Sequence, residues 1–153
     1  MINRWDGTIG FIGGKVEQGL NFESNIKKEV KEEIGHDFNL ELESIVAHDI
    51  GPITTHAFAS KVSYETLKHI LKDAANSNNI GSEVTGVFTP HLIDYDQKTK
   101  KRKGGITELY KASMAPSVRE ELTHFLLKKK IFTKERLEEI TKKAGYSLRE
   151  LLL

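Results

Sequence analysis

The sequence has no cysteine, almost no net charge and no long hydrophobic run. Without cysteine the chain has no disulfide, no thiolate metal site and no cysteine nucleophile. No apolar segment approaches the roughly 20 residues of a membrane-spanning helix. The start, MINRWDGTIG, lacks the apolar stretch of a signal peptide. A net charge of +1 gives no global attraction to nucleic acid or membrane. We therefore expect no membrane association and a cytoplasmic location.

The length of 153 residues predicts a single domain, 1–153, that is large enough to bury a core. No internal repeat or domain linker divides the chain. Strand patterns dominate the first part, and helix patterns lie between the strands and after them. This order predicts an α+β fold, arranged as an α/β/α sandwich.

The boundaries of the predicted elements follow from periodicity, turn residues and capping signals. The predicted strands are Ile9–Ile12, Asn39–Asp49, Ile53–Val62 and Glu83–Phe88. The predicted helices lie between Asn21 and Gly35, between Ser63 and about Ala75, after Ser117, and between Thr133 and Gly145. Two capping boxes are predicted: Ser117-x-x-Glu120 opens the helix that follows Ser117, and Ser147-x-x-Glu150 opens a short terminal helix.

A glycine pair, Gly13-Gly14, leads into a predicted helix that carries several glutamates. At helical spacing Glu29, Glu32 and Glu33 share one side of this helix. Three carboxylates beside a glycine loop suit a hard divalent cation. The alternative is an ordinary solvated face, on which the lysines between the glutamates form i,i+4 ion pairs.

The same stretch resembles the Nudix box, which begins here at Gly14 and ends at Gly35. The matching positions are Gly14, Glu29, Val30, Glu32, Glu33 and Gly35. The sequence departs from the pattern at Leu20, where the box has its first glutamate, and at Lys28, where the box has arginine. Lysine keeps the positive charge but loses the two-pronged donor geometry of arginine, so the resemblance predicts slower turnover than a full box gives.

The resemblance extends to WDGTIGFIGG, to Gly81-x-Glu83-Val84-x-Gly86 and to SVREEL. Together these segments look like the Nudix branch of the snoRNA-decapping and inosine-diphosphate hydrolases, which also contains syndesmos. The resemblance implies a Nudix fold with a mixed central sheet, here lacking the usual first strand, and extra C-terminal helices in 131–153. An uncovered sheet edge invites pairing with another chain, so a homodimer is expected.

By this resemblance the protein hydrolyses a nucleoside diphosphate derivative, with Mg²⁺ or Mn²⁺ as cofactor. The implied metal ligands are Glu29, Glu32, Glu33 and the carbonyl of Gly14. The implied catalytic residues are Glu32, Glu33 and Glu83, the last as general base or extra ligand. The implied substrate-binding residues are Phe11, Lys28 and His56. Structural roles remain open for three of them: a strand-edge ion pair for Glu83, a core aromatic for Phe11 and a packed histidine for His56.

The candidate substrates are inosine or deoxyinosine diphosphate, ADP-ribose and capped RNA. The basic segment Asp96–Gly105 suits either phosphate contact or plain solvation, so RNA is a possible partner. The alternative function is a Nudix-fold nucleotide- or RNA-binding scaffold with little or no activity, which the departures at Leu20 and Lys28 favour.

Overall fold

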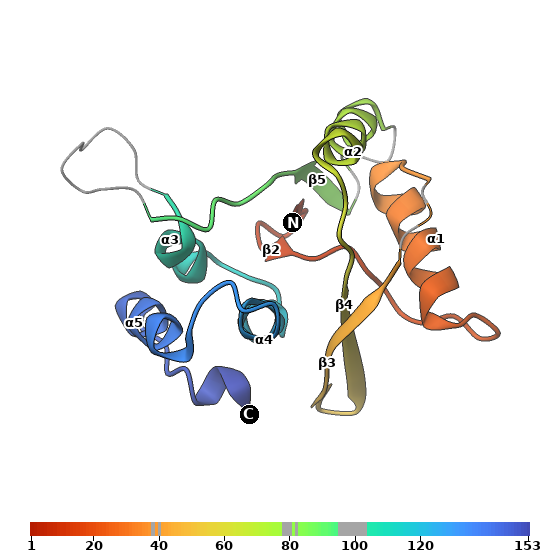
Figure 1. Cartoon of the computed structure of the whole chain (residues 1–153). Coiled ribbons are helices and arrows are strands. Elements are labelled where there is room, and N and C mark those ends of the chain that lie inside the picture. The colour runs from red at the N-terminus through yellow and green to blue at the C-terminus, as the bar shows by residue number, and fades with distance from the viewer. Residues whose placement is uncertain (38, 40, 78–80, 82, 95–103) are drawn as a thin grey trace. The chain divides into compact units, whose positions relative to one another are not determined.

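The computed structural model describes residues 1–37, 39, 41–77, 81, 83–94 and 104–153 (Figure 1). The chain gathers into two compact units, which we describe separately. The first unit contains Met1–Glu43 and Ala59–Phe88, and the second contains Ser44–Phe58 and Thr89–Leu153. Most of the predicted basic segment, 96–103, lies outside the described residues. No helix of the described parts is long and apolar enough to cross a membrane.

The first unit combines a small sheet with two helices. Its strands are β1 (Ile2–Arg4), β2 (Ile9–Gly10) and β5 (Val84–Val87), in the order β2-β1-β5. Its helices are α1 (Phe22–Ile34) and α2 (Tyr64–Asn76). Both partners of β1 run antiparallel to it, so the mixed sheet of the prediction is corrected to antiparallel pairing in the described residues. The chain reverses between β1 and β2 because Gly7 takes a positive φ and the Asp6 carboxylate accepts hydrogen bonds from Thr8.

The helix of the glycine–glutamate stretch forms between the predicted signals. The Asn21 side chain accepts a hydrogen bond from the Ser24 N–H, and Gly35 ends the helix in the left-handed conformation, with its N–H donated to the Lys31 carbonyl. The helix therefore begins and ends where its sequence predicts.

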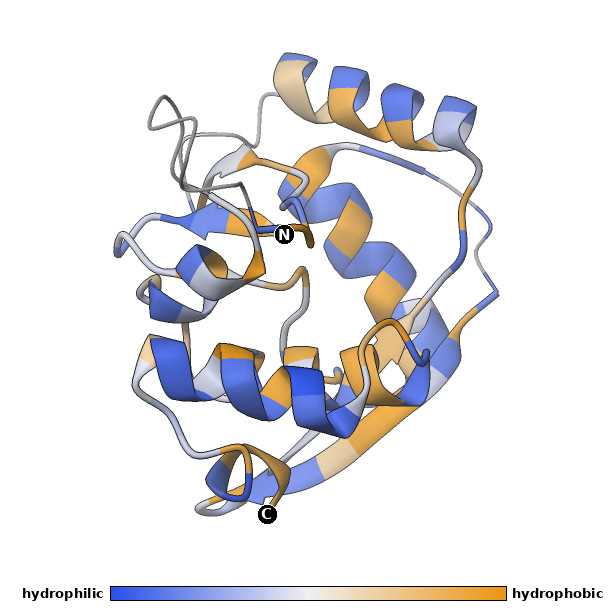
Figure 2. Cartoon of the chain, turned by 60° about the vertical axis from the view of Figure 1, so that its left-hand side comes forward, coloured by the Kyte–Doolittle hydropathy of each residue, from blue (hydrophilic) through white to orange (hydrophobic). Residues whose placement is uncertain are grey.

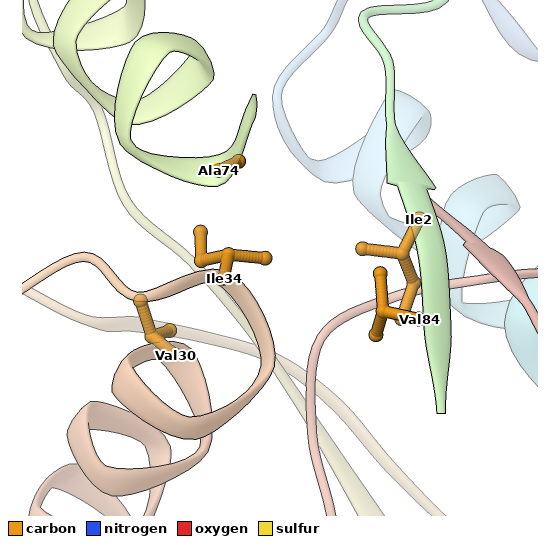
Figure 3. Packing of buried hydrophobic residues seen from close by; sticks show 5 residues of the cluster. All are labelled: Ile2, Val30, Ile34, Ala74 and Val84. Atoms are coloured by element: carbon orange, nitrogen blue, oxygen red, sulfur yellow. The ribbon is translucent and has the colours of Figure 1, made fainter. Parts of the chain in front are cut away.

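The apolar side of α1 anchors it to the core of the first unit. Val30 and Ile34 are buried together with Ala74 of α2. Figure 3 shows these side chains facing Ile2 of β1 and Val84 of β5. Burying each large aliphatic side chain contributes about 1.5–3 kcal/mol, so this contact holds the glutamate-bearing helix against the sheet.

The second unit contains a β-hairpin and a group of helices. The hairpin strands are β3 (Glu43–Ile50) and β4 (Ile53–Ala59). The helices are α3 (Ile106–Lys111), α4 (Val118–Lys128), α5 (Lys134–Ala144) and the short 3₁₀ helix η2 (Glu150–Leu152). Figure 2 shows hydrophobic and hydrophilic residues alternating along the helices, as amphipathic packing requires. The buried residues of these helices include Tyr110, Leu126, Leu137 and Ile140.

Capping in the second unit differs partly from the prediction. Thr133 caps α5 by accepting from the Arg136 N–H, and Gly145 ends it, as predicted. Ser117 precedes α4 at a φ of 69° and its hydroxyl donates to the Glu121 carboxylate instead of capping the backbone, so the first capping box is wrong. The second box also fails, because the chain forms only the 3₁₀ turn η2 after Ser147. A single domain with a helical extension over 131–153 stays a prediction.

Candidate functional site

The glycine loop lies against the glutamates of α1. The Gly13 N–H donates a hydrogen bond to Oε2 of Glu33 over 3.2 Å. The Gly14 backbone lies so close to the Glu29 carboxylate that a Cβ added at Gly14 would collide with it. Glycine at position 14 therefore permits a backbone approach that a side chain would block.

A pocket of about 240 Å³ opens beside this loop in the first unit. It is lined by Ile2, Arg4, Trp5, Gly13, Glu33 and Glu83. Glu83 directly precedes β5, and its carbonyl accepts a hydrogen bond from the Trp5 N–H over 3.1 Å. This backbone contact between the end of β1 and the start of β5 carries Glu83 to the wall that Glu33 also lines. Two carboxylates that are 50 positions apart in the chain thus share one pocket.

Electrostatics in the pocket disfavour full ionisation of the glutamates. Burial raises the pKa of Glu33 to about 7, and repulsion from Glu29 and Glu83 acts in the same direction. The Gly13 N–H and the Arg4 guanidinium offset this rise in pKa only in part. Burial also raises the pKa of Glu29, with further repulsion from Glu32. The carboxylates therefore lack enough positive charge around them, which is the condition that a bound cation relieves.

Lys28 forms an ion pair with Glu32 and does not line the pocket. The Lys28 ammonium donates to Glu32 Oε2 over 3.0 Å and to Glu17 Oε1 over 2.7 Å. Hydrogen bonds to these two carboxylates raise the pKa of Lys28. Neither Lys28 nor Glu32 lines the pocket. The alternative of an ordinary solvated face with i,i+4 ion pairs thus applies to Glu32, which pairs with Lys28. It does not apply to Glu33, which lines the pocket.

Two predicted substrate-binding residues also lie outside this pocket. Phe11 does not line the pocket. The residue is 36% exposed, so it is not a buried core aromatic either. His56 lies exposed on β4, in the second unit. The first unit therefore brings together Gly13, Gly14, Glu29, Glu33 and Glu83, and the roles of all predicted site residues stay predictions.

Two residues of the pocket wall, Arg4 and Trp5, are not among the predicted site residues. Arg4 lines it with a guanidinium whose Nε is enclosed and makes no hydrogen bond in the described parts of the chain, although it lies 3.6 Å from the Asp6 carboxylate. Trp5 also lines the pocket and is 67% exposed. Both residues stand at the start of the run Trp5-Asp6-Gly7-Thr8 or just before it, and this run has the pattern of a turn. An arginine and an exposed indole beside two carboxylates offer a cation and a stacking surface to a ligand.

Glu29 and Glu33 have the ligand chemistry that a divalent cation requires, but within the described part of the chain their side chains do not converge with a third side-chain ligand. Across the described residues, no three histidine or acidic side chains converge in a way that could hold a metal ion. However, Glu29 and Glu33 offer oxygen donors of like charge, and Gly14 keeps space beside Glu29 that a Cβ would fill. Such hard oxygen donors on a packed helix suit Mg²⁺ or Mn²⁺.

Comparison with known families identifies the fold. A family model described as Nudt16-like, U8 snoRNA-decapping enzyme-like, matches residues 1–132. The chain belongs to this family. Among curated proteins, the U8 snoRNA-decapping enzyme of Xenopus laevis is 25% identical over 153 residues, which cover 93% of this chain and 69% of that protein. The Nudt16-like assignment confirms the predicted resemblance to the snoRNA-decapping Nudix branch and the α+β class. It also identifies the general type of protein as a Nudix hydrolase.

Proposed function

We propose that this protein hydrolyses a phosphoanhydride bond in a nucleoside diphosphate derivative, with Mg²⁺ or Mn²⁺ as cofactor. One observation carries the proposal: Glu33 shares a pocket with Glu83 and has a pKa raised to about 7 by burial and by neighbouring carboxylates. Buried, repelling acids are costly to the fold, and they are common where a cation or a proton has to be bound.

Glu29 and Glu33 would hold the cation, with the Gly14 carbonyl beside them and Glu32 as a further ligand once released from Lys28. A divalent cation supplies charge neutralisation for the diphosphate and lowers the pKa of a water nucleophile. Glu83 would accept the proton of that water, because it reaches the same pocket as Glu33.

The remaining pocket residues would bind the nucleotide. The Arg4 guanidinium offers charge-assisted hydrogen bonds to phosphate oxygens. The exposed Trp5 indole offers a surface on which a base can stack. Phe11, His56 and Lys28 stay predictions for substrate contact, as do the homodimer and the cytoplasmic location. Light scattering at micromolar concentration tests the homodimer directly.

The candidate substrates are inosine or deoxyinosine diphosphate, ADP-ribose and capped RNA. The name of the Xenopus relative favours capped RNA among them. A panel of these compounds, incubated with the purified protein and Mg²⁺ or Mn²⁺, would be analysed by chromatography for release of a nucleoside monophosphate.

The decisive variant is Glu33→Gln, which keeps the size and the Gly13 hydrogen bond but removes the charge. We expect its rate to fall by more than about 100-fold, because loss of a metal ligand exceeds the 10–100-fold cost of changing an outer contact. Glu23→Gln is the matched control, because Glu23 is exposed on the same helix and pairs with Lys27. A normal rate in Glu33→Gln would refute the assigned role.

Metal binding separates the hydrolase from the scaffold alternative. Calorimetry with Mn²⁺ should show binding to the wild type and none to the double variant Glu29→Ala/Glu33→Ala. If the wild type binds no Mn²⁺ at millimolar concentration, the scaffold becomes the better description.

A further inference from the structure

Glu17 connects the glycine loop to α1 through its backbone as well as its side chain. Its N–H donates to Oδ1 of Asn25 over 3.0 Å, and its carboxylate accepts from the Lys28 ammonium over 2.7 Å. Asn25 is only 3% exposed, so it is a fixed acceptor within the helix. The Glu17 carbonyl accepts from the Leu20 N–H over 3.1 Å, which closes a turn that contains Gly19 at a φ of 88°.

This turn places an acidic residue close to position 20, where the chain has no glutamate. Leu20 stands where the Nudix box has its first glutamate, and its side chain is half-buried and carries no charge. Glu17 precedes it by three residues, and the turn between them presents the Glu17 carboxylate to Lys28. Lys28 itself stands where the box has arginine. The carboxylate that contacts the lysine at the arginine position of the box therefore comes from position 17 of the loop and not from position 20.

The pair lies where it can affect the site. Lys28 is held between Glu17 on the loop and Glu32 on α1. The same loop carries Gly13, whose N–H reaches Glu33, and Gly14, which lies against Glu29. Fixing Glu17 to the helix therefore fixes the glycines against the two carboxylates.

We propose that Glu17 is a positioning residue that replaces the missing first glutamate of the box and, through the contact of its carboxylate with Lys28, holds the glycine loop in register with Glu29 and Glu33. The Asn25 contact of its backbone N–H supports the same register and persists when the side chain is changed. This inference rests on the proposed hydrolase function, which supplies the reaction that the loop serves. Small displacements of a reacting geometry can reduce a rate by up to about 100-fold, although an exposed ion pair by itself stabilises a fold very little.

The pair Glu23–Lys27 provides a matched control on the same helix. Its N–O distance is also 2.7 Å, and its exposed fractions of 57% and 36% are close to the 53% and 36% of Glu17 and Lys28. It differs by lying within one helix, four residues apart, without linking the loop. A general effect of removing a surface charge would thus appear equally in Glu23→Gln and Glu17→Gln.

The first measurement is steady-state hydrolysis of the best diphosphate substrate. We expect Glu17→Gln to lower kcat about 10-fold while KM changes less than about twofold, and Glu23→Gln to match the wild type. The rescue variant is Glu17→Gln/Leu20→Glu, which returns a carboxylate to the position of the box. We expect it to recover most of the lost kcat, which a merely structural effect of Glu17 would not produce. Wild-type kcat in Glu17→Gln, or no recovery in the double variant, overturns the proposal.

The second measurement does not depend on activity. Hydrogen exchange followed by mass spectrometry should show faster exchange in peptides covering 13–20 in Glu17→Gln, unchanged exchange in Glu23→Gln, and slower exchange again in the double variant. If the wild type hydrolyses no substrate, the proposed function fails, and this exchange pattern still decides whether Glu17 holds the loop. Unchanged exchange over 13–20 in Glu17→Gln overturns that role.

Discussion

Two arginines, one in each unit, differ in how many of their donors have partners within the protein. Arg119 of α4 donates to the carbonyls of Tyr110 and Ala112 over 3.1 and 2.8 Å, and its guanidinium stacks on the Tyr146 ring at 4.2 Å. Arg4 of β1 has an enclosed Nε without a hydrogen bond in the described parts, and it faces a pocket. Arg119 thus has three partners within its unit, whereas Arg4 has the Asp6 carboxylate 3.6 Å from its Nε and lines a pocket.

The acids of the two units show the same contrast. Both oxygens of Asp94 accept hydrogen bonds from Thr107, from its N–H at 2.9 Å and from its hydroxyl at 2.6 Å, and Arg136 lies 3.7 Å away. Glu33 accepts from the Gly13 N–H at 3.2 Å and otherwise faces the charges of Glu29 and Glu83, which the Arg4 guanidinium offsets only in part. Polar groups with complete sets of partners stabilise a fold, and groups left short of partners beside a pocket point to a ligand.

Arg119→Ala should give the largest loss of stability. The variant removes two hydrogen bonds to carbonyls and the contact with the Tyr146 ring, so we expect the free energy of unfolding to fall by about 2–4 kcal/mol. Urea denaturation followed by circular dichroism measures it. A loss below about 0.5 kcal/mol would remove the contrast with Arg4.

Asp94→Ala should come next. It leaves the buried Thr107 N–H at the start of α3 without its acceptor, and such a loss costs about 1–3 kcal/mol. Asp6→Ala is a matched control, because Asp6 accepts the same pair of hydrogen bonds from Thr8 but in an exposed turn. We expect a clearly smaller loss for Asp6→Ala in the same denaturation experiment. Equal losses would mean that the burial of the Asp94 cluster contributes nothing.

The sequence identifies α1 and its glutamates well because every signal for them is local. Asn21, the spacing of Val30 and Ile34, and Gly35 all act within one helix. The resemblance to the snoRNA-decapping Nudix branch adds Glu83, through Gly81-x-Glu83-Val84-x-Gly86, which spacing alone does not connect to Glu33. Local signals and a family pattern together were thus enough for the centre of the candidate site.

The missed elements depend on partners that are distant in sequence. β1 has only three residues and exists because β2 and β5 pair with both of its edges. The sequence predicts no element at α3, because the N–H of Thr107 near its start is satisfied by Asp94, 13 residues earlier in the chain. Glu17 and Arg4 were missed for the same reason, since only the fold shows where a long side chain ends.

Glu33→Gln should increase stability, opposite in sign to Asp94→Ala. The pKa of Glu33 is raised in the folded protein, from 4.5 to about 7. Between these values the folded state binds more protons than the unfolded state, so the wild type loses stability as pH rises through this window. We expect a gain of about 1 kcal/mol for the variant at pH 8, after allowance for solvent screening, and almost none at pH 4. Denaturation at both pH values checks it, with Glu23→Gln as a control that should not reproduce the gain. A loss at pH 8 would mean that Glu33 is as structural as Asp94.

Arg4→Met should have the smallest effect on stability and still separate the two arginines. Methionine keeps an apolar stem against Gly10, near which the Arg4 methylenes lie, and removes the guanidinium with its ion pair to Asp6. That pair is 3.6 Å long and partly exposed, so its loss costs little. We expect the free energy of unfolding to change by less than about 0.5 kcal/mol, the range of surface substitutions. In contrast, KM for a diphosphate substrate should rise about 10-fold, the equivalent of one charge-assisted hydrogen bond. If Arg4→Met instead loses as much stability as Arg119→Ala with KM unchanged, the Arg4 guanidinium supports the sheet and the pocket has no cation reserved for phosphate.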